Sequence, residues 1–169
     1  PGFVAGHYSR EDLDIDLVKL ARFANARLIV GRATHIDPAT KSVSVEGYPD
    51  IHFDVASIDI GITSEMPDLK GFAAHGVPAK PLGAFASKWE TFLAGDDPAE
   101  VAVLGGGVAG AELAMAMSFA LTRKGRNPDV KLIDRSSVLS GFNKTARSKL
   151  IKALAKNNVT LVENAQVDS

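Results

Sequence analysis

The stretch Val101-Ala-Val-Leu-Gly-Gly-Gly-Val-Ala-Gly-Ala-Glu-Leu-Ala114 decides the fold of this 169-residue chain. Its first four residues, Val101–Leu104, are apolar and predict a buried strand. Three consecutive glycines then break the pattern, and an apolar run from Ala109 to Leu121 predicts a helix. A strand, a glycine-rich turn and a helix in direct succession are typical of the nucleotide-binding units of α/β proteins.

The glycines fit the spacing G-x-G-x-x-G through Gly105, Gly107 and Gly110. This spacing indicates a dinucleotide-binding turn when an acidic residue ends the next strand, and Asp134 directly follows the strand-like run Val130–Ile133. Gly105 would permit the tight turn, Gly107 would let a pyrophosphate approach the backbone, and Gly110 would let the helix pack closely on the strand. The free N–H groups at the helix start attract phosphate oxygens.

Asp134 also bears on the choice between NAD and NADP. Its carboxylate could accept hydrogen bonds from ribose hydroxyls and would repel a 2′-phosphate, which favours NAD; Arg135 keeps NADP as the lesser alternative. Asp134 lies 24 positions past Gly110, and the loop Arg123–Asp129 can absorb the extra residues. The competing interpretation is a glycine-rich turn that binds nothing.

The elements after this turn alternate regularly. The strand Val130–Ile133 is followed by an amphipathic helix, Lys144–Lys156, and by a third strand, Val159–Val162. This β-α-β-α-β order predicts an α/β fold with a Rossmann-like parallel sheet.

The region before this sheet has a different pattern. A helix is predicted to begin at Ser9–Asp12 and to continue to Ala24, and another to cover Leu82–Leu93. Five short strand-like runs lie between these helices. Three of them, separated by turn residues, predict a small antiparallel meander: Arg32–Ile36, Ser42–Glu46 and Ile51–Asp54. The other two are Leu28–Val30 before the meander and Val55–Ile60 after it. Residues 62–81 predict a connecting loop, and Gly95–Pro98 is the predicted boundary between domains 1–98 and 99–169.

Composition excludes several classes of protein. With 46% hydrophobic and 23% charged residues the chain has the balance of a globular protein rather than a disordered one. A net charge of −1 argues against a nucleic-acid binder. The chain has no cysteine, so it has neither a disulfide nor a thiolate metal site, and it contains no apolar stretch long enough to span a membrane. We expect a cytoplasmic protein, with peripheral membrane contact as an alternative for the intact protein.

The glycine stretch from Val103 to Ala114 resembles the NAD(P)H half of the pyridine nucleotide-disulfide oxidoreductase family, flavoproteins with two dinucleotide-binding domains. Val130–Arg135 followed by Val138-Leu139 is also typical of that family. Upstream, Phe53–Gly61 resembles the second flavin-domain motif, a strand that ends in a glycine near bound FAD. The nearest branch is type II NADH dehydrogenase-like proteins, including relatives fused to selenophosphate synthetase.

The resemblance implies that residues 1–98 are part of an FAD-binding domain and residues 99–169 the first half of an NAD(P)H-binding domain. The first FAD-binding glycine motif is absent, so we expect a piece of a larger protein that is inactive alone. The resemblance implies no catalytic residue and no metal ligand in this chain. The cofactor-binding residues that it implies are Gly61, Gly105, Gly106, Gly107, Val108, Ala109, Gly110, Glu112, Asp134 and Arg135. Glu112 would lie near the contact of nicotinamide and flavin; a buried, hydrogen-bonded carboxylate is the alternative.

The intact protein is then expected to pass hydride from NADH to FAD, and electrons onward to an unknown second acceptor. One alternative is a regulatory or sensor domain that binds dinucleotides without turnover; another is a flavin-free NAD-dependent dehydrogenase. The expected partners are small-molecule dinucleotides, and a homodimer would form through regions outside this stretch.

Some other residues receive structural interpretations. The four histidines lack the spacing of metal ligands and predict surface positions. Met115, Met117 and Phe119 predict core packing. The exposed face of the helix Lys144–Lys156 is predicted to hold four basic residues: Lys144, Arg147, Lys149 and Lys152.

Overall fold

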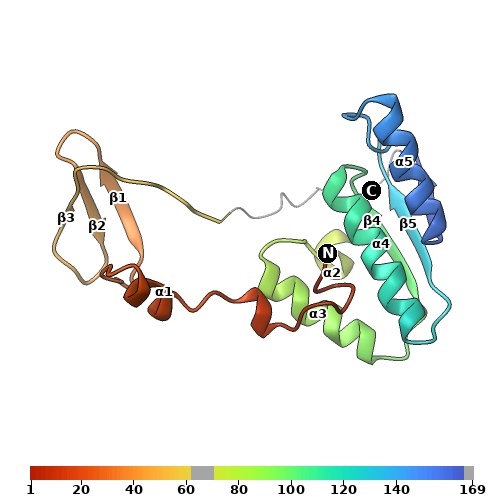
Figure 1. Ribbon diagram of the computed structural model, residues 1–169, viewed down its shortest axis with the longest axis horizontal. Helices are drawn as coiled ribbons and strands as arrows, with labels where there is room; N and C mark the ends of the chain where they lie inside the picture. The colour runs from red at the N-terminus through yellow and green to blue at the C-terminus, as the bar shows by residue number, and fades with distance from the viewer. Residues whose placement is uncertain (62–70, 166–169) are drawn as a thin grey trace. The chain divides into compact units, whose positions relative to one another are not determined.

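The computed structural model describes residues 1–61 and 71–165 (Figure 1). The chain forms two compact units, which are described separately. One comprises Asp14–Gly61, and the other joins Pro1–Leu13 to the chain from residue 62 onward. The predicted boundary at Gly95–Pro98 lies within the second of these units.

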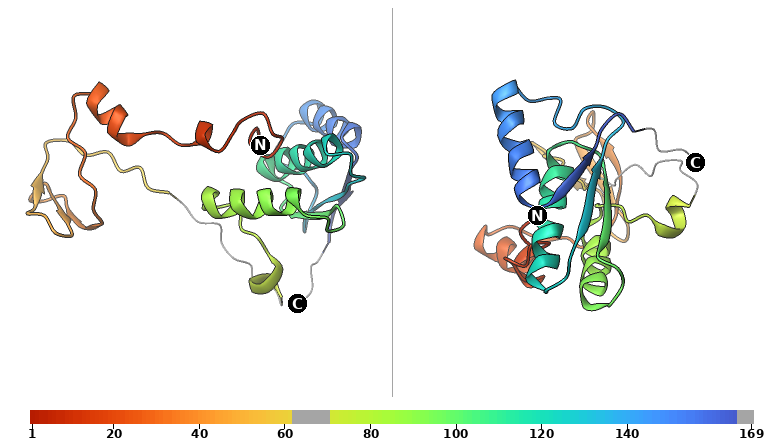
Figure 2. Two further views of the ribbon diagram at one scale, coloured as in Figure 1. Left: turned by 90° about the horizontal axis from the view of Figure 1, so that it is seen from below. Right: turned by 90° about the vertical axis from the view of Figure 1, so that its right-hand side faces the viewer.

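The larger unit contains the parallel sheet. Its strands have the order β4-β5-β6, and both neighbouring pairs are parallel. One helix follows each of the first two strands, so the elements in chain order are β4 (Glu100–Leu104), α4 (Val108–Arg123), β5 (Asp129–Ile133), α5 (Lys144–Lys156) and β6 (Val159–Val162). This confirms the predicted Rossmann-like β-α-β-α-β unit, shown from two further sides in Figure 2.

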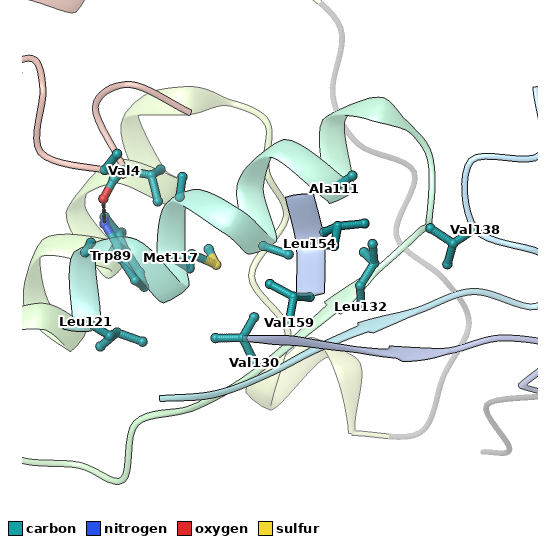
Figure 3. Close-up of a cluster of buried hydrophobic side chains, with 14 of the residues drawn as sticks. Val4, Trp89, Ala111, Met117, Leu121, Val130, Leu132, Val138, Leu154 and Val159 are labelled. Carbon is teal, nitrogen blue, oxygen red and sulfur yellow. Dashed lines mark hydrogen bonds between the residues drawn. The ribbon is translucent and has the colours of Figure 1, made fainter. Parts of the chain in front are cut away.

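A single hydrophobic core holds this unit together. Val130 and Leu132 of β5 are fully buried, because alternate residues of a strand face the same side and these two face the helices (Figure 3). Leu121 of α4 and Leu154 of α5 are fully buried in the same core. Helix α3 (Leu82–Ala94) extends the core with two buried aromatic side chains, Phe85 and Trp89.

The start of the chain belongs to the same core. Val4 is buried, and its carbonyl oxygen accepts a hydrogen bond from the indole Nε1 of Trp89 at 3.1 Å. Figure 3 shows the two residues joined by a dashed line. A buried indole N–H needs such a partner, so this bond fixes the N-terminal residues against α3.

The smaller unit is the predicted antiparallel meander. Its strands pair in the order β1-β2-β3, after a short helix, and the elements are α1 (Leu17–Phe23), β1 (Ala33–Asp37), β2 (Ser42–Val45) and β3 (Ile51–His52). None of the hydrophobic side chains between Asp14 and Gly61 is buried. The meander is therefore held by its ladder hydrogen bonds and turns rather than by a core of its own.

Two predicted strands do not form. Leu28–Val30 and Val55–Ile60 have no strand structure, and Val55 is 89% exposed. A β-branched run adopts a strand when a neighbouring strand pairs with it, and no described strand pairs with either run.

The first predicted helix begins later than expected. Ser9 and Asp12 do bond each other's backbone N–H groups, but the resulting turn continues only as the 3-10 helix η1 (Glu11–Leu13). Helix α1 starts after Asp16, whose carboxylate accepts from the N–H groups of Val18 and Lys19 at 3.0 Å each. The stronger cap therefore lies at Asp16.

The predicted loop 62–81 contains a short helix, α2 (Phe72–His75). Residues 62–70 of this loop lie outside the described residues.

Phe119 is predicted in the core but is 38% exposed. Residues two apart on a helix face different sides, so Phe119 cannot share the buried face of Met117. Its ring lies against the imidazole of His7 and the guanidinium of Arg123. In the described part of the chain, no helix has the length and apolarity needed to cross a membrane.

Candidate dinucleotide-binding site

The turn after β4 presents backbone rather than side chains. Gly105 has a φ of +105°, a conformation that favours glycine, and its N–H donates to the carbonyl oxygen of Ile133 at 2.8 Å. Helix α4 then begins after Gly107, and no described side chain caps its first N–H groups. The 16-residue helix thus leaves its positive end and unpaired amides open at this turn.

Gly107 and Gly110 are needed for opposite reasons. A Cβ atom at Gly110 would lie 1.9 Å from the carbonyl oxygen of Gly105 and 3.3 Å from Cδ1 of Leu132, so the turn excludes any side chain there. A Cβ atom at Gly107 would meet no described atom within 4 Å. The space beside Gly107 is therefore available to a ligand that approaches the helix start.

Gly106, the middle glycine, is the most tightly held residue of the turn. Its N–H donates to Oδ2 of Asp134 at 2.6 Å, and its carbonyl oxygen accepts from the N–H of Leu139 at 2.8 Å. A Cβ atom at this position would lie 2.8 Å from Cγ2 of Val138 and 2.9 Å from Cβ of Asp134. The fingerprint leaves this position unrestricted, so sequence reasoning gave it no packing role.

Asp134 connects the turn to the loop after β5. Its Oδ1 accepts from the N–H and the hydroxyl of Ser136, at 2.7 and 2.8 Å. Together with the bond from Gly106, three of roughly four acceptor positions of the carboxylate are filled. One position is left for an outside donor such as a ribose hydroxyl.

These hydrogen bonds also set the charge of Asp134. The N–H of Gly106 has the largest effect, followed by the N–H and hydroxyl of Ser136, and together they lower the pKa of the carboxyl below its ordinary value. The neighbouring charge of Arg135, itself exposed, lowers this pKa further. Asp134 is therefore an anion at neutral pH, as a residue that repels a 2′-phosphate has to be.

The structure brings together part of the predicted site. Gly105 to Gly110 and Asp134 lie at one edge of the sheet, where β4 and β5 end. Glu112 lies on α4, where it is exposed and its carboxylate bonds to no described residue; its role near the nicotinamide stays a prediction. Gly61 belongs to the smaller unit, and a Cβ atom there would meet no described atom within 4 Å.

Within residues 1–61 and 71–165, no metal centre competes with a dinucleotide at this turn. Among the described residues there is no group of three or more histidine or acidic side chains that could hold an ion. The residues gathered here instead suit a dinucleotide, because uncapped amides, an open glycine and an anionic acceptor match phosphate and ribose groups.

Gly107 and Gly110 provide a matched pair of variants. We expect Gly110→Ala to lower the free energy of unfolding by about 2–3 kcal/mol, because the added methyl group clashes with backbone. Gly107→Ala should cost no more than about 1 kcal/mol, the difference between the two residues as a helix cap. Urea denaturation of both variants measures the difference; equal losses would contradict the packing described.

The lowered pKa of Asp134 predicts a pH dependence of stability. The ordinary pKa of 3.8 applies in the unfolded chain, and the folded value is lower. The carboxylate therefore stabilises the fold fully above about pH 4–5, and this contribution is lost as the pH falls through the folded pKa. Thermal unfolding between about pH 5 and pH 3 should show a steeper loss of stability for the wild type than for Asp134→Asn. Parallel curves would show that the ionisation of Asp134 contributes nothing to stability.

Comparison with known proteins places this geometry in a family. The family model described as pyridine nucleotide-disulphide oxidoreductase matches residues 8–169. No curated protein sequence matches the chain.

Solved structures share the fold at low sequence identity. An NAD-dependent persulfide reductase from A. fulgidus aligns with a TM-score of 0.73 and 19% identity over 99% of this chain and 32% of its own. The water-forming NADH oxidase from Lactobacillus brevis, bound to NADH, aligns with a TM-score of 0.72 and 22% identity over 99% of this chain and 38% of its own. For the sulfide:quinone oxidoreductase from the hyperthermophilic bacterium Aquifex aeolicus, the TM-score is 0.73 and the identity 18%, over 98% of this chain and 41% of its own.

This chain thus spans between 32% and 41% of the length of these three proteins. Their likeness shows the shared fold, and the family match covers nearly the whole sequence. The chain belongs to the pyridine nucleotide-disulphide oxidoreductase family.

Proposed function

We propose that the turn after β4 holds the pyrophosphate of NADH. The observation that carries this proposal is the open space beside Gly107 at the uncapped start of α4. Two phosphates placed there would accept hydrogen bonds from the first amides of the helix, those of Val108 and Ala109, and would meet the positive end of its dipole.

Asp134 would bind the adenosine ribose and favour NADH over NADPH. Its one remaining acceptor position suits a single ribose hydroxyl, and its negative charge opposes a 2′-phosphate. Arg135 is exposed next to it and would offset part of that repulsion. Glu112, exposed on α4, would help to seat the nicotinamide, and Gly61 would lie near FAD.

For the intact protein we propose hydride transfer from NADH to FAD and then electron transfer to a second acceptor. The cofactors supply this chemistry, and the part played by this chain is to bind and orient the NADH. Residues 1–98 would belong to the FAD-binding domain and residues 99–169 to the NAD(P)H-binding domain. The names of the similar structures include a persulfide, water formation and a quinone, so they do not favour one acceptor.

The test of this function uses the full-length protein. Its visible spectrum is recorded without oxygen, and NADH is then added; we expect a flavin spectrum that bleaches. Bleaching by NADPH but not by NADH would overturn the proposed preference. A flavoprotein that binds NADH while its flavin stays oxidised would favour the regulatory domain. A protein that binds no added FAD would favour the flavin-free dehydrogenase.

Replacing Asp134 tests its role directly. We expect Asp134→Ala to weaken NADH binding about tenfold, because a charge-assisted hydrogen bond to ribose is lost and the turn loses its anchor at Gly106. NADPH binding should fall less, since the repulsion of the 2′-phosphate disappears. Fluorescence titration with both nucleotides measures the two affinities, and an unchanged NADH affinity would rule out this role.

A further inference from the structure

Val138, in the loop after β5, is held at both of its backbone polar groups. Its N–H donates to Oε1 of Glu163 at 2.7 Å, and its carbonyl oxygen accepts from Nε of Arg147 at 2.8 Å. The same Glu163 oxygen accepts from Nη2 of Arg147 at 2.7 Å, so the two side chains form an ion pair around the residue that they hold.

The two side chains come from different elements. Arg147 lies in the first turns of α5, whose start is capped by Asn143, and Glu163 directly follows the last residue of β6. Each side chain is 32% exposed, so the pair is partly withdrawn from water. Predicted as one of the exposed basic residues of α5, Arg147 instead anchors the loop, while Lys144, Lys149 and Lys152 are exposed as expected.

The loop held in this way supports the glycine turn. Val138 is fully buried, and its Cγ2 fills the place where a side chain at Gly106 would lie. The next residue, Leu139, donates its N–H to the carbonyl oxygen of Gly106 at 2.8 Å. A short chain of contacts therefore runs from the ion pair through Val138 and Leu139 to the middle of the turn.

We infer that Arg147 and Glu163 are positioning residues for the dinucleotide-binding turn, an inference that rests on the proposed function. Neither side chain hydrogen-bonds to the turn itself. They fix Val138, and this places the N–H of Leu139 where it donates to the carbonyl oxygen of Gly106. Gly106 in turn sets where the N–H groups of Gly107 and the start of α4 point. Breaking the pair removes one of the two supports of Gly106, while the bond to Asp134 remains.

The test measures NADH binding to variants of the full-length protein. We expect Glu163→Ala and Arg147→Ala to weaken NADH binding about tenfold, because the amides that would hold the pyrophosphate are then no longer fixed in place before NADH binds. Glu163→Gln keeps an oxygen that can accept from Val138 and should recover most of the affinity. The flavin spectrum and kcat should change little, because neither residue reaches the reacting atoms in this account.

Lys131→Ala is the matched control. It breaks the exposed ion pair within β5 between Nζ of Lys131 and Asp129, the first residue of the strand, at 2.9 Å. We expect it to leave NADH affinity unchanged. Wild-type NADH affinity in folded Glu163→Ala and Arg147→Ala would overturn the inference, as would an equal loss in Lys131→Ala. Should the alanine variants fail to fold, NADH affinity is measured for Arg147→Lys and Glu163→Gln instead. Arg147→Lys keeps the charge without the planar fork and should bind NADH more weakly than Glu163→Gln, and equal wild-type affinities would overturn the inference.

Hydrogen exchange separates this inference from the proposed function. The amide of Leu139, whose N–H bonds to the carbonyl oxygen of Gly106, should exchange faster in Glu163→Ala than in wild type without any nucleotide, since the loop that carries it is released. Unchanged exchange would contradict the positioning role. A wild-type protein that binds no NADH would refute the proposed function, whereas the exchange rates would still decide whether the ion pair positions the turn.

Discussion

The hydrogen bond from the N–H of Gly106 to the carboxylate of Asp134, at 2.6 Å, is the contact on which the site depends. It joins the turn after β4 to the end of β5, next to the bond from Gly105 to Ile133. Because β4 and β5 are parallel neighbours, their carboxyl ends lie at one edge of the sheet. This bond joins the two loops that leave the sheet at that edge. It also keeps Asp134 charged by lowering its pKa.

The three consecutive glycines meet three separate constraints. Gly105 needs a positive φ, Gly106 has no room between Asp134 and Val138, and Gly107 leaves room that a ligand can use. Gly110 meets a fourth, the close approach of α4 to the turn. One short stretch thus fixes the turn, the packing of the helix and the open phosphate position together, which is why so few residues predict so much of the fold.

The sequence predicts best those elements that carry their own pattern. The helix Lys144–Lys156 has the predicted bounds, and the strands of the parallel sheet agree within a residue, because buried strands and amphipathic helices are visible in local periodicity. Val55–Ile60 shows the limit of such reasoning, since its β-branched residues form no strand without a neighbour. The roles of Arg147 and Glu163 could not be predicted, because the contacts that they make at Val138 join residues from three separate elements.

Most of the function proposed for this chain depends on whether the turn from Gly105 to Gly107 and the start of α4 hold a pyrophosphate. The most direct measurement is a crystal structure of the full-length protein with NADH bound. We expect the pyrophosphate beside Gly107, within hydrogen-bond distance of the first amides of α4, and a ribose hydroxyl on Asp134. A nucleotide bound elsewhere, with this turn empty, would contradict it.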